Sequence, residues 1–325
     1  MPKQNQSGQL DRIVEAILAR ADGSLAGVSA RMIPQGRAAF ALRGLPRESF
    51  RARLLEDLKR RAEMASTGVK PIREGFHTIT PYIIVPGAAG LIDFMKKAFD
   101  ATEMFRVARP GTSLIMHAEV RIGDSMVELA DAIEQYPPTP ASIHLYVKDV
   151  DRIYSQAMEA GAKSLHGVVN QPYGDREGTV EDPTGTMWCI ATHLGVVHVP
   201  SGMRTVTPYL IVRGADRLMD FVKNAFEGEQ MERHLGPEGT IVHGMMKIGD
   251  SMIEMSEAHG QWGPRPSTIH LYVPNTDELY ARALEAGATS IQPPADQPYG
   301  DRSAGVSDEF GNRWFVATHI RDVRP

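Results

Sequence analysis

The pattern of hydrophobic and polar positions changes once along the chain, near residue 76. Before this point, apolar residues recur at three- and four-residue spacing over residues 8–21 and 46–64, which predicts two amphipathic helices. After it, short apolar runs predict strands, and the first run, Ile79–Val85, precedes a helical pattern at Ala88–Phe99. We therefore expect a small helical head followed by a body of strands and helices.

The body contains two copies of one sequence pattern, offset by about 126 residues. Its most regular stretch is Ser142–Asp151, SIHLYVKDVD, a strand running into a helix, which returns as Ser267–Asp277, STIHLYVPNTD. Other recurring segments are Thr78–Tyr82 with Thr205–Tyr209, Ile122–Met126 with Ile248–Met252, and Gln171–Arg176 with Gln297–Arg302. The repeat predicts three parts: a basic helical head and linker at 1–76, one domain at 77–195 and a second at 204–320.

Each copy divides again into two halves of similar pattern. In the first half, two strands form a hairpin across Gly123-Asp124, and this two-residue turn sets Glu119 opposite Glu128. The second half begins with the strand Ile143–Val147, followed by a helix and further strands. Each half is thus a βαβββ unit, and the predicted fold class is α+β.

Charge is unevenly distributed along the chain. The net charge is −5, but residues 1–70 carry 13 Lys and Arg against 7 Asp and Glu, so the head is about +6 and the remainder about −11. The head has no helix-turn-helix pattern and no set of aromatic residues for base stacking, so nucleic acid is not favoured as a partner. We expect the head to dock on the acidic body.

Cys189 is the single cysteine, so neither an internal disulfide nor a cysteine zinc cluster can form. This favours a reducing, cytoplasmic location. No apolar run reaches the roughly 18 residues that cross a bilayer, and the N-terminus lacks the apolar region of a secretory signal, so no membrane partner is expected. No phosphate-binding loop or dinucleotide motif is present, so no nucleotide cofactor is expected.

The paired βαβββ units resemble the vicinal oxygen chelate superfamily of glyoxalase, bleomycin-resistance and dioxygenase proteins, and above all its PhnB-like branch. The motifs that carry the resemblance are Thr80-Pro81-Tyr82, His117-Ala118-Glu119, Ile122–Ser125, His144–Val147, Tyr173–Arg176 and Trp188–His193, with their second-copy partners. The resemblance implies a cup that holds a small molecule, often around a divalent metal. It implies no single reaction, because the superfamily includes isomerases, dioxygenases, epimerases, thiol transferases and drug-sequestering proteins.

The resemblance also implies how the units pair. Single-domain relatives often build their cups from two chains, so the two copies here are expected to act as an internal pseudo-dimer. A cup would then combine the first half of one copy with the second half of the other, for example Glu128 with His270. Whether the chain also forms a homo-oligomer is left open.

The resemblance places the metal-ligand positions of the first copy at about Thr80, Glu128, Ser142 and Cys189. In the second copy they fall at about Thr207, Glu254, Ser267 or Thr268, and Phe315. Only the two glutamates are good ligands for a hard divalent metal, so a standard four-ligand site is not supported.

Neighbouring histidines offer replacement ligands. His144 lies two residues after Ser142 and therefore on the same strand face, and the hairpin register puts His117 on the face of Glu128. We expect His117, Glu128 and His144 to converge, with His243, Glu254 and His270 as the second set. Two histidines and one carboxylate are a known ligand set for divalent iron and related metals such as manganese, nickel or zinc, and the glutamates would be the catalytic proton carriers.

A structural role competes with each of these assignments. A histidine within an apolar strand, such as His144, is more often a hydrogen-bonded core residue than a ligand. Glu128 is harder to explain in this way, because an unpaired buried carboxylate is costly. For the other residues that stand out we expect Trp188, Trp314 and Cys189 in the core, and His193 and His319 at the rim.

Aromatic and basic residues of the repeated motifs are the candidate substrate-binding side chains: Tyr82, Tyr146, Arg176, Tyr209, Tyr272 and Arg302. The Tyr-Gly-Asp-Arg motif is expected first to be a tight turn with a fixed Asp–Arg pair. In the alternative, Arg176 and Arg302 reach into the cups and clamp an anionic ligand.

Two functional classes follow from these residues. The missing metal ligands favour a protein that binds a small molecule in its cupped sheet without a metal. Glu128 and Glu254 keep open a metal-dependent lyase, isomerase or dioxygenase acting on a small oxygenated substrate. The sequence does not decide whether the protein is an enzyme.

Overall fold

The computed structural model describes residues 68–323 together with Leu55, Leu58, Lys59 and Ala62. The chain divides into two compact units, residues 1–70 with 320–325, and residues 71–319. The four isolated positions are helical, and the rest of the predicted helices at 8–21 and 46–64 lies outside the described residues. Among the helices of the described residues, none has the length and apolar character needed to span a membrane.

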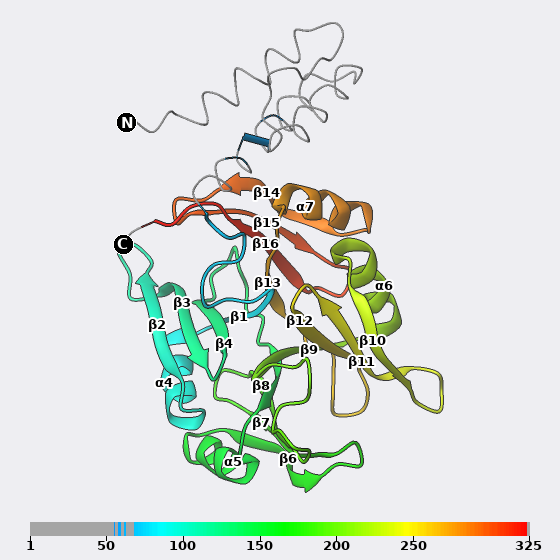
Figure 1. The fold of residues 1–325 in the computed structure, drawn as a ribbon. Coiled ribbons are helices and arrows are strands. Elements are labelled where there is room, and N and C mark those ends of the chain that lie inside the picture. Colours follow the sequence, from blue (N-terminus) through cyan, green and yellow to red (C-terminus); the bar gives the residue numbers. More distant parts are fainter. Residues whose placement is uncertain (1–54, 56–57, 60–61, 63–67, 324–325) are drawn as a thin grey trace, which may run out of the picture. The chain divides into compact units, whose positions relative to one another are not determined.

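The second unit repeats the predicted βαβββ pattern four times (Figure 1). The first copy contains β1 (Ile79–Val85), α4 (Ala88–Ala98), β2 (Thr102–Ala108), β3 (Ile115–Ile122), β4 (Ser125–Asp131), then β5 (Ser142–Tyr146), α5 (Val150–Glu159), β6 (Lys163–Asn170), β7 (Asp175–Glu181) and β8 (Met187–His193). The second contains β9 (Val206–Val212), α6 (Ala215–Phe226), β10 (Glu229–Leu235), β11 (Ile241–Ile248), β12 (Ser251–Glu257), then β13 (Thr268–Tyr272), α7 (Thr276–Glu285), β14 (Thr289–Asp296), β15 (Asp301–Ser307) and β16 (Arg313–His319).

The strands form two eight-stranded mixed sheets, and each sheet takes one unit from each copy. One sheet has the order β14-β15-β16-β13-β1-β4-β3-β2, and we call its polar face cup A. The other has the order β10-β11-β12-β9-β5-β8-β7-β6, and its polar face is cup B. The copies join where β1 runs antiparallel to β13 and β5 antiparallel to β9. The expected pairing of opposite halves is therefore confirmed.

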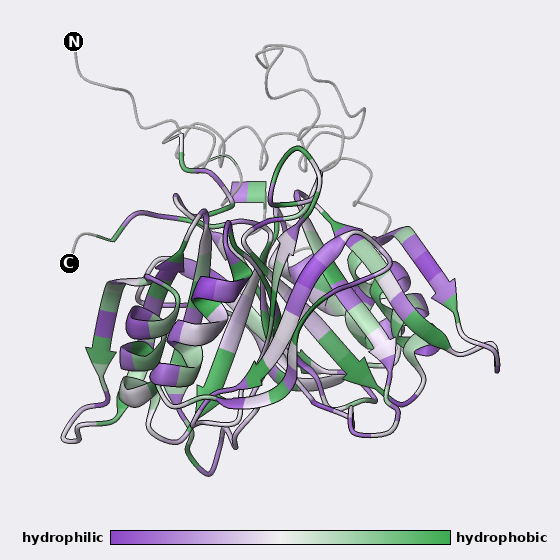
Figure 2. Cartoon of the chain, turned by 90° about the horizontal axis from the view of Figure 1, so that it is seen from below, coloured by the Kyte–Doolittle hydropathy of each residue, from purple (hydrophilic) through white to green (hydrophobic). Residues whose placement is uncertain are grey.

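The apolar cores follow the copies rather than the sheets. One buried cluster joins α4 and α5 to the strands of the first copy, and a second joins α6 and α7 mainly to those of the second. The two helix pairs lie on opposite flanks of the strands (Figures 1 and 2). Trp188 and Trp314 are fully buried in these clusters, as predicted. Alternation along each strand thus sends apolar side chains to the helices and leaves the other face to a cup.

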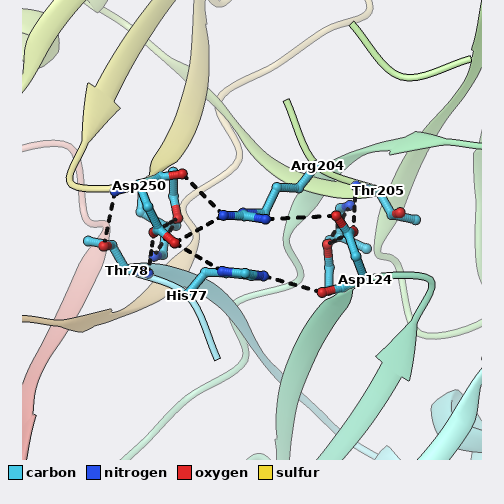
Figure 3. A network of polar contacts seen from close by, with 10 residues as sticks. His77, Thr78, Asp124, Arg204, Thr205 and Asp250 are labelled. Atoms are coloured by element: carbon cyan, nitrogen blue, oxygen red, sulfur yellow. Dashed lines mark hydrogen bonds and ion pairs between the residues drawn. The ribbon is translucent and has the colours of Figure 1, made fainter. Parts of the chain in front are cut away.

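Two hairpin turns fasten one copy to the other (Figure 3). The Asp250 carboxylate accepts a hydrogen bond of 2.9 Å from the backbone N–H of Thr78, and the Asp124 carboxylate accepts one of 3.0 Å from Thr205. Arg204 lies between the two carboxylates, at 3.0 Å from Asp250 and 3.8 Å from Asp124. Although burial opposes the change, these contacts lower the pKa of both aspartates. We call this network the clasp.

Candidate functional site: two polar cups

Cup A is centred on Glu128, which is 1% exposed. His270, from the other copy, brings its Nδ1 to 2.6 Å from Glu128 Oε2. His117 lies on the other side, with its Nε2 4.0 Å from Glu128 Oε1 and 3.2 Å from Glu119 Oε1. The predicted register of Glu119 opposite Glu128 is confirmed. One buried carboxylate thus bridges histidines of two different copies.

Cup B repeats this arrangement around Glu254, which is 3% exposed. His144 Nδ1 lies 2.9 Å from Glu254 Oε2, and His243 Nε2 lies 3.2 Å from Glu254 Oε1. His144 also stacks on Tyr146, with ring centroids 4.3 Å apart. The structural alternative considered for His144, a hydrogen-bonded residue within the sheet, therefore holds for its Nδ1.

The grouping of His117 and Glu128 with His144 was wrong, because β3 and β4 lie in one sheet and β5 lies in the other. His144 joins Glu254 and His243, whereas His270 joins Glu128 and His117. The pairing of Glu128 with His270 expected for an internal pseudo-dimer is the one observed. Sequence spacing within one copy cannot reveal this exchange, because the partner strands are far apart along the chain.

The first-strand position beside each glutamate also differs from the prediction. Tyr82 and not Thr80 lies next to Glu128 in the parallel strands, and Tyr209 likewise lies next to Glu254. On the opposite side of each cup, His270 lies beside Phe315 and His144 beside Cys189. Ser142 is fully buried, and within the described part of the chain its hydroxyl has no hydrogen-bond partner. Tyr82 and His144 thus lie two residues after the predicted Thr80 and Ser142, whereas Thr80 itself lies opposite His270.

The charged pair in cup B is strongly coupled. Burial alone would favour the neutral forms, but the Coulombic attraction and the hydrogen bond between His144 and Glu254 outweigh burial and favour the charged forms. They raise the pKa of His144 to about 9 and lower the pKa of Glu254 to about 2. At neutral pH the imidazolium can therefore donate through both ring nitrogens, and the carboxylate stays ionised.

One nitrogen of that imidazolium has no hydrogen-bond partner among the residues that the structure describes. His144 Nε2 is buried, and its nearest carboxylate, Glu177 Oε2, lies 3.7 Å away, beyond hydrogen-bond distance. Burial raises the pKa of Glu177 above its ordinary value, despite the attraction of His144. Cup A has no acid at this position, because Ser303 takes the place of Glu177.

Cup A differs by carrying its own cation. Arg73, in the segment before β1, forms an ion pair with Glu119 and places its guanidinium carbon 4.2 Å from the centre of the Phe76 ring. The Phe76 N–H donates a hydrogen bond to the Arg73 carbonyl, and in the turn before β9 the Met203 N–H donates in the same way to the Pro200 carbonyl. Pro200 therefore occupies in the second copy the position that Arg73 occupies in the first.

The partner of Arg73 is missing from cup B as well. Met245 occupies in β11 the place that Glu119 occupies in β3, opposite the central glutamate. Both members of the Arg73–Glu119 pair are thus absent together from cup B. An ion pair internal to the chain covers the carboxylates of cup A, and this difference between the copies was not anticipated from the repeat.

Aspartates of the Tyr-Gly-Asp-Arg motif support each cup. Asp175 accepts a hydrogen bond of 3.0 Å from the Tyr146 hydroxyl and lies 2.6 Å from His193 Nδ1. Asp301 contacts Tyr272 and His319 in the same way, at 2.8 Å each. The rim position predicted for His319 was wrong, since it is 5% exposed and held by Asp301. The sequence signal for this supporting role was the aspartate that both Tyr-Gly-Asp-Arg motifs contain.

The arginines of that motif do not reach the cups. Strand alternation turns them to the face opposite their neighbouring aspartates, where Arg176 binds Asp151 at 2.7 Å and Arg302 forms a bidentate pair with Asp277. Each pair connects its strand, β7 or β15, to the first turn of the helix that precedes it in the same unit, α5 or α7. Both predictions for these arginines were therefore wrong: they neither pair with the aspartate of their own turn nor clamp an anion in the cup.

Cys189 also departs from the prediction of a core residue. It is partly exposed and lies beside His144 in the parallel strands, on the face of cup B. Thr179 is its hydrogen-bond partner, at 3.9 Å. Burial raises the pKa of the thiol, which disfavours a thiolate and fits the absence of an activated cysteine from the sequence motifs.

Two groups of three side chains within the described residues bring one metal-ligating atom each to within 4.8 Å of one another. They are His117 with Glu119 and Glu128 in cup A, and Glu232 with His234 and His243 at the edge of cup B. The first group contains the partner of Arg73. The chemistry of these donors suits a divalent metal, and no metal identity follows from it.

Paired βαβββ units with a histidine–glutamate centre in each cup define a tandem, internally paired cup protein. A family model named Glyoxalase/Bleomycin resistance protein/Dioxygenase superfamily matches residues 75–190 and 198–316. The chain belongs to this superfamily, whose members typically use divalent metals and bind small molecules.

Relatives and solved structures agree with this assignment. An uncharacterized protein of Mycobacterium tuberculosis strain H37Rv is 40% identical over 123 residues, which cover 34% of this chain and 72% of that protein. A matching protein of Mycobacterium bovis is 40% identical over 123 residues, covering 34% of this chain and 80% of its own length. The predicted assignment to the superfamily is confirmed, and the PhnB-like branch stays a prediction.

The structural neighbours share the tandem fold. Glyoxalase I from Zea mays has a TM-score of 0.58 at 14% identity, covering 74% of this chain and 92% of its own. A protein described as a putative dioxygenase from Bacillus subtilis has a TM-score of 0.51 at 12% identity, covering 75% and 85%. At this identity the likeness establishes the fold, and the reaction has to be argued from the cups.

Proposed function

We propose that the protein binds a small oxygen-bearing molecule in cup B. The observation that carries this proposal is the buried Nε2 of His144, for which the described residues provide no hydrogen-bond partner. A buried donor without a partner costs about 1–3 kcal/mol, so a ligand oxygen that accepts this hydrogen bond recovers that free energy. Because Glu254 already holds Nδ1, the imidazolium is fixed in orientation before a ligand arrives.

Neighbouring side chains support a polar and partly aromatic ligand. Glu177 has a raised pKa, so its carboxyl group can share a proton with a ligand oxygen. Tyr173 donates a hydrogen bond of 3.3 Å to Glu177, and the rings of Tyr146 and Tyr209 lie against His144 and His243 of the same cup. We assign to cup B a carbonyl, carboxylate or phenol ligand. A cytoplasmic location is part of this proposal, and the single cysteine supports it.

Cup A is assigned a structural role in the same proposal. Arg73 neutralises Glu119 beside Glu128, so the acidic centre of this cup already holds an internal cation. Cup B has Pro200 and Met245 at these places, so neither member of this ion pair has a counterpart there.

A direct test compares the two histidines. A panel of 2-oxo acids, 2-hydroxy acids and catechols is screened by thermal shift against the full chain, against His144→Asn and against the matched control His270→Asn. We expect at least one compound to stabilise the full chain and His270→Asn but not His144→Asn. A compound that stabilises all three equally, or a panel that stabilises none, contradicts the assignment to cup B.

The second candidate is a metal-dependent lyase, isomerase or dioxygenase. It is favoured by the two histidines that flank one buried glutamate in each cup, a donor set that fits divalent iron, manganese, nickel or zinc. His117, Glu128 and His270, or His144, Glu254 and His243, would hold the metal, which would supply a Lewis acid for a substrate oxygen. In either cup the glutamate would also accept a substrate proton.

Metal content separates this candidate from the first. We would measure bound iron, manganese, nickel and zinc in untagged protein by mass spectrometry after incubation with each salt. Metal that is retained by the parent chain and lost from the double variant Glu128→Ala with Glu254→Ala would support the metal-dependent candidate. No retained metal in the parent chain contradicts it.

A further inference from the structure

A second cluster of metal-ligating groups lies at the outer edge of cup B, apart from the pair of His144 and Glu254. It consists of Glu232 and His234 on the edge strand β10 and His243 on β11, and we call it the β10–β11 site. His234 and His243 are direct cross-strand partners, and Glu232 lies two residues before His234 on the same face.

The distances among these side chains suit one small cation. Glu232 Oε2 lies 3.1 Å from His234 Nε2 and 3.6 Å from His243 Nδ1, and all three ligating atoms are within 4.8 Å of one another. Ligands of a tetrahedral zinc at about 2.0–2.1 Å from the metal lie about 3.3 Å apart, so small side-chain rotations suffice. In the described part of the chain, Glu232 has ion pairs only with these two histidines.

The inner nitrogen of His243 is oriented by a buried carboxylate. Its Nε2 lies 3.2 Å from Glu254 Oε1, while its Nδ1 faces Glu232. Metal-bound histidines commonly donate their second ring N–H to a carboxylate, which fixes the ring and increases the basicity of the ligating nitrogen. His144 holds the other oxygen of Glu254, so the orienting carboxylate is itself fixed.

The first copy provides an internal comparison. In the first copy, Val107 of β2 lies opposite His117 of β3, just as His234 of β10 lies opposite His243 of β11. Phe105, opposite Glu119, likewise occupies the position that Glu232 has in the second copy. The histidine of β11 thus has its counterpart, but the two residues on the edge strand have become apolar. The duplicated scaffold carries the three donors in one copy only.

We propose that Glu232, His234 and His243 form a binding site for a borderline divalent metal such as zinc, nickel or cobalt at the edge of cup B. Two imidazole nitrogens and one carboxylate oxygen suit these metals, and the exposure of Glu232 and His234 leaves room for water as a further ligand. This site uses Nδ1 of His243, whereas the candidate centre inside the cup would use Nε2 of the same ring.

Zinc and cobalt titrations of the untagged full chain, stripped with a chelator, test the proposal. We expect one high-affinity equivalent per chain, with the visible spectrum of cobalt bound through nitrogen and oxygen. His234→Val, which installs the residue of the first copy, is expected to weaken binding by at least tenfold, and so is Glu232→Gln. Because His234 is 64% exposed, its replacement leaves the core intact, and circular dichroism checks this.

A gain of binding gives the complementary experiment. Phe105→Glu combined with Val107→His places the missing donors beside His117 and is expected to raise the zinc stoichiometry from one to two. Binding that is unchanged in both His234→Val and Glu232→Gln overturns the proposal. Binding lost in His144→Asn but kept in His234→Val also overturns it, because the metal would then lie inside the cup.

Discussion

At the residue scale, the two cups use the same buried pair and differ in what surrounds it. Glu128 and Glu254 each bind a histidine from the opposite copy, which explains how a carboxylate is tolerated at 1–3% exposure. What distinguishes the cups is a second charge: Arg73 with Glu119 in cup A and Glu177 in cup B.

Removing Arg73 is expected to destabilise the protein. Arg73→Ala leaves Glu119, which is 6% exposed, without its cation, and we expect the free energy of unfolding to fall by about 1–3 kcal/mol. Arg73→Ala with Glu119→Met, the residue of cup B, is expected to recover most of this loss, because no unpaired charge remains. Urea unfolding of both variants and of the parent chain measures the interaction free energy between Arg73 and Glu119.

Pro200→Ala is the matched control, since Pro200 occupies the place of Arg73 in the second copy. We expect its free energy of unfolding to change by less than about 1 kcal/mol. A double variant no more stable than Arg73→Ala would show that Arg73 and Glu119 are not energetically coupled.

At the scale of elements, the hairpin turns connect the two copies. Gly123 and Gly249 have φ values of 58°, in the left-handed region, and each turn packs on a threonine at the start of a strand from the other copy. Asp124 and Asp250, the next residue of each turn, accept the hydrogen bonds of the clasp (Figure 3). A glycine is needed here for backbone conformation and for the close approach.

Gly249→Ala tests this packing. A Cβ at residue 249 would overlap the Thr78 side chain, in addition to the cost of about 1–2 kcal/mol for a left-handed alanine. Gly239→Ala is the control, because Gly239 has a φ of 75° and no atom within 4 Å of the added Cβ. We expect Gly249→Ala to lower the melting temperature by more than Gly239→Ala does. Equal shifts would mean that the contact with Thr78 contributes nothing.

At the scale of the whole molecule, each helix-side core consists mainly of residues from one copy, whereas each sheet takes strands from both copies. The first copy alone would leave β1 and β5 as edge strands of half-sheets, and each half-cup would hold only one member of its histidine–glutamate pair. Exposed strand edges of this kind pair readily with another chain. The duplication therefore provides within one chain the partner that a single copy needs.

A single copy is therefore expected to dimerise. Residues 68–203, expressed alone, should form a homodimer in which β1 of one chain pairs with β5 of the other. Size-exclusion chromatography with light scattering measures the mass, and a stable, folded monomer would contradict this expectation. Asp124→Ala in the fragment is expected to weaken the dimer, since Asp124 contributes to the clasp.

Local patterns determined the βαβββ units, the hairpin register of Glu119 and Glu128 and the burial of the tryptophans, because each depends on residues close together in the chain. The repeat also indicated two copies of one domain, and the resemblance to the superfamily implied that opposite halves of the copies pair. The tertiary structure alone decided which histidine meets which glutamate, that Arg73 reaches cup A, and that Arg176 turns away from cup B. These contacts join strands distant in sequence, and their geometry depends on sheet pairing and strand alternation rather than on local preference.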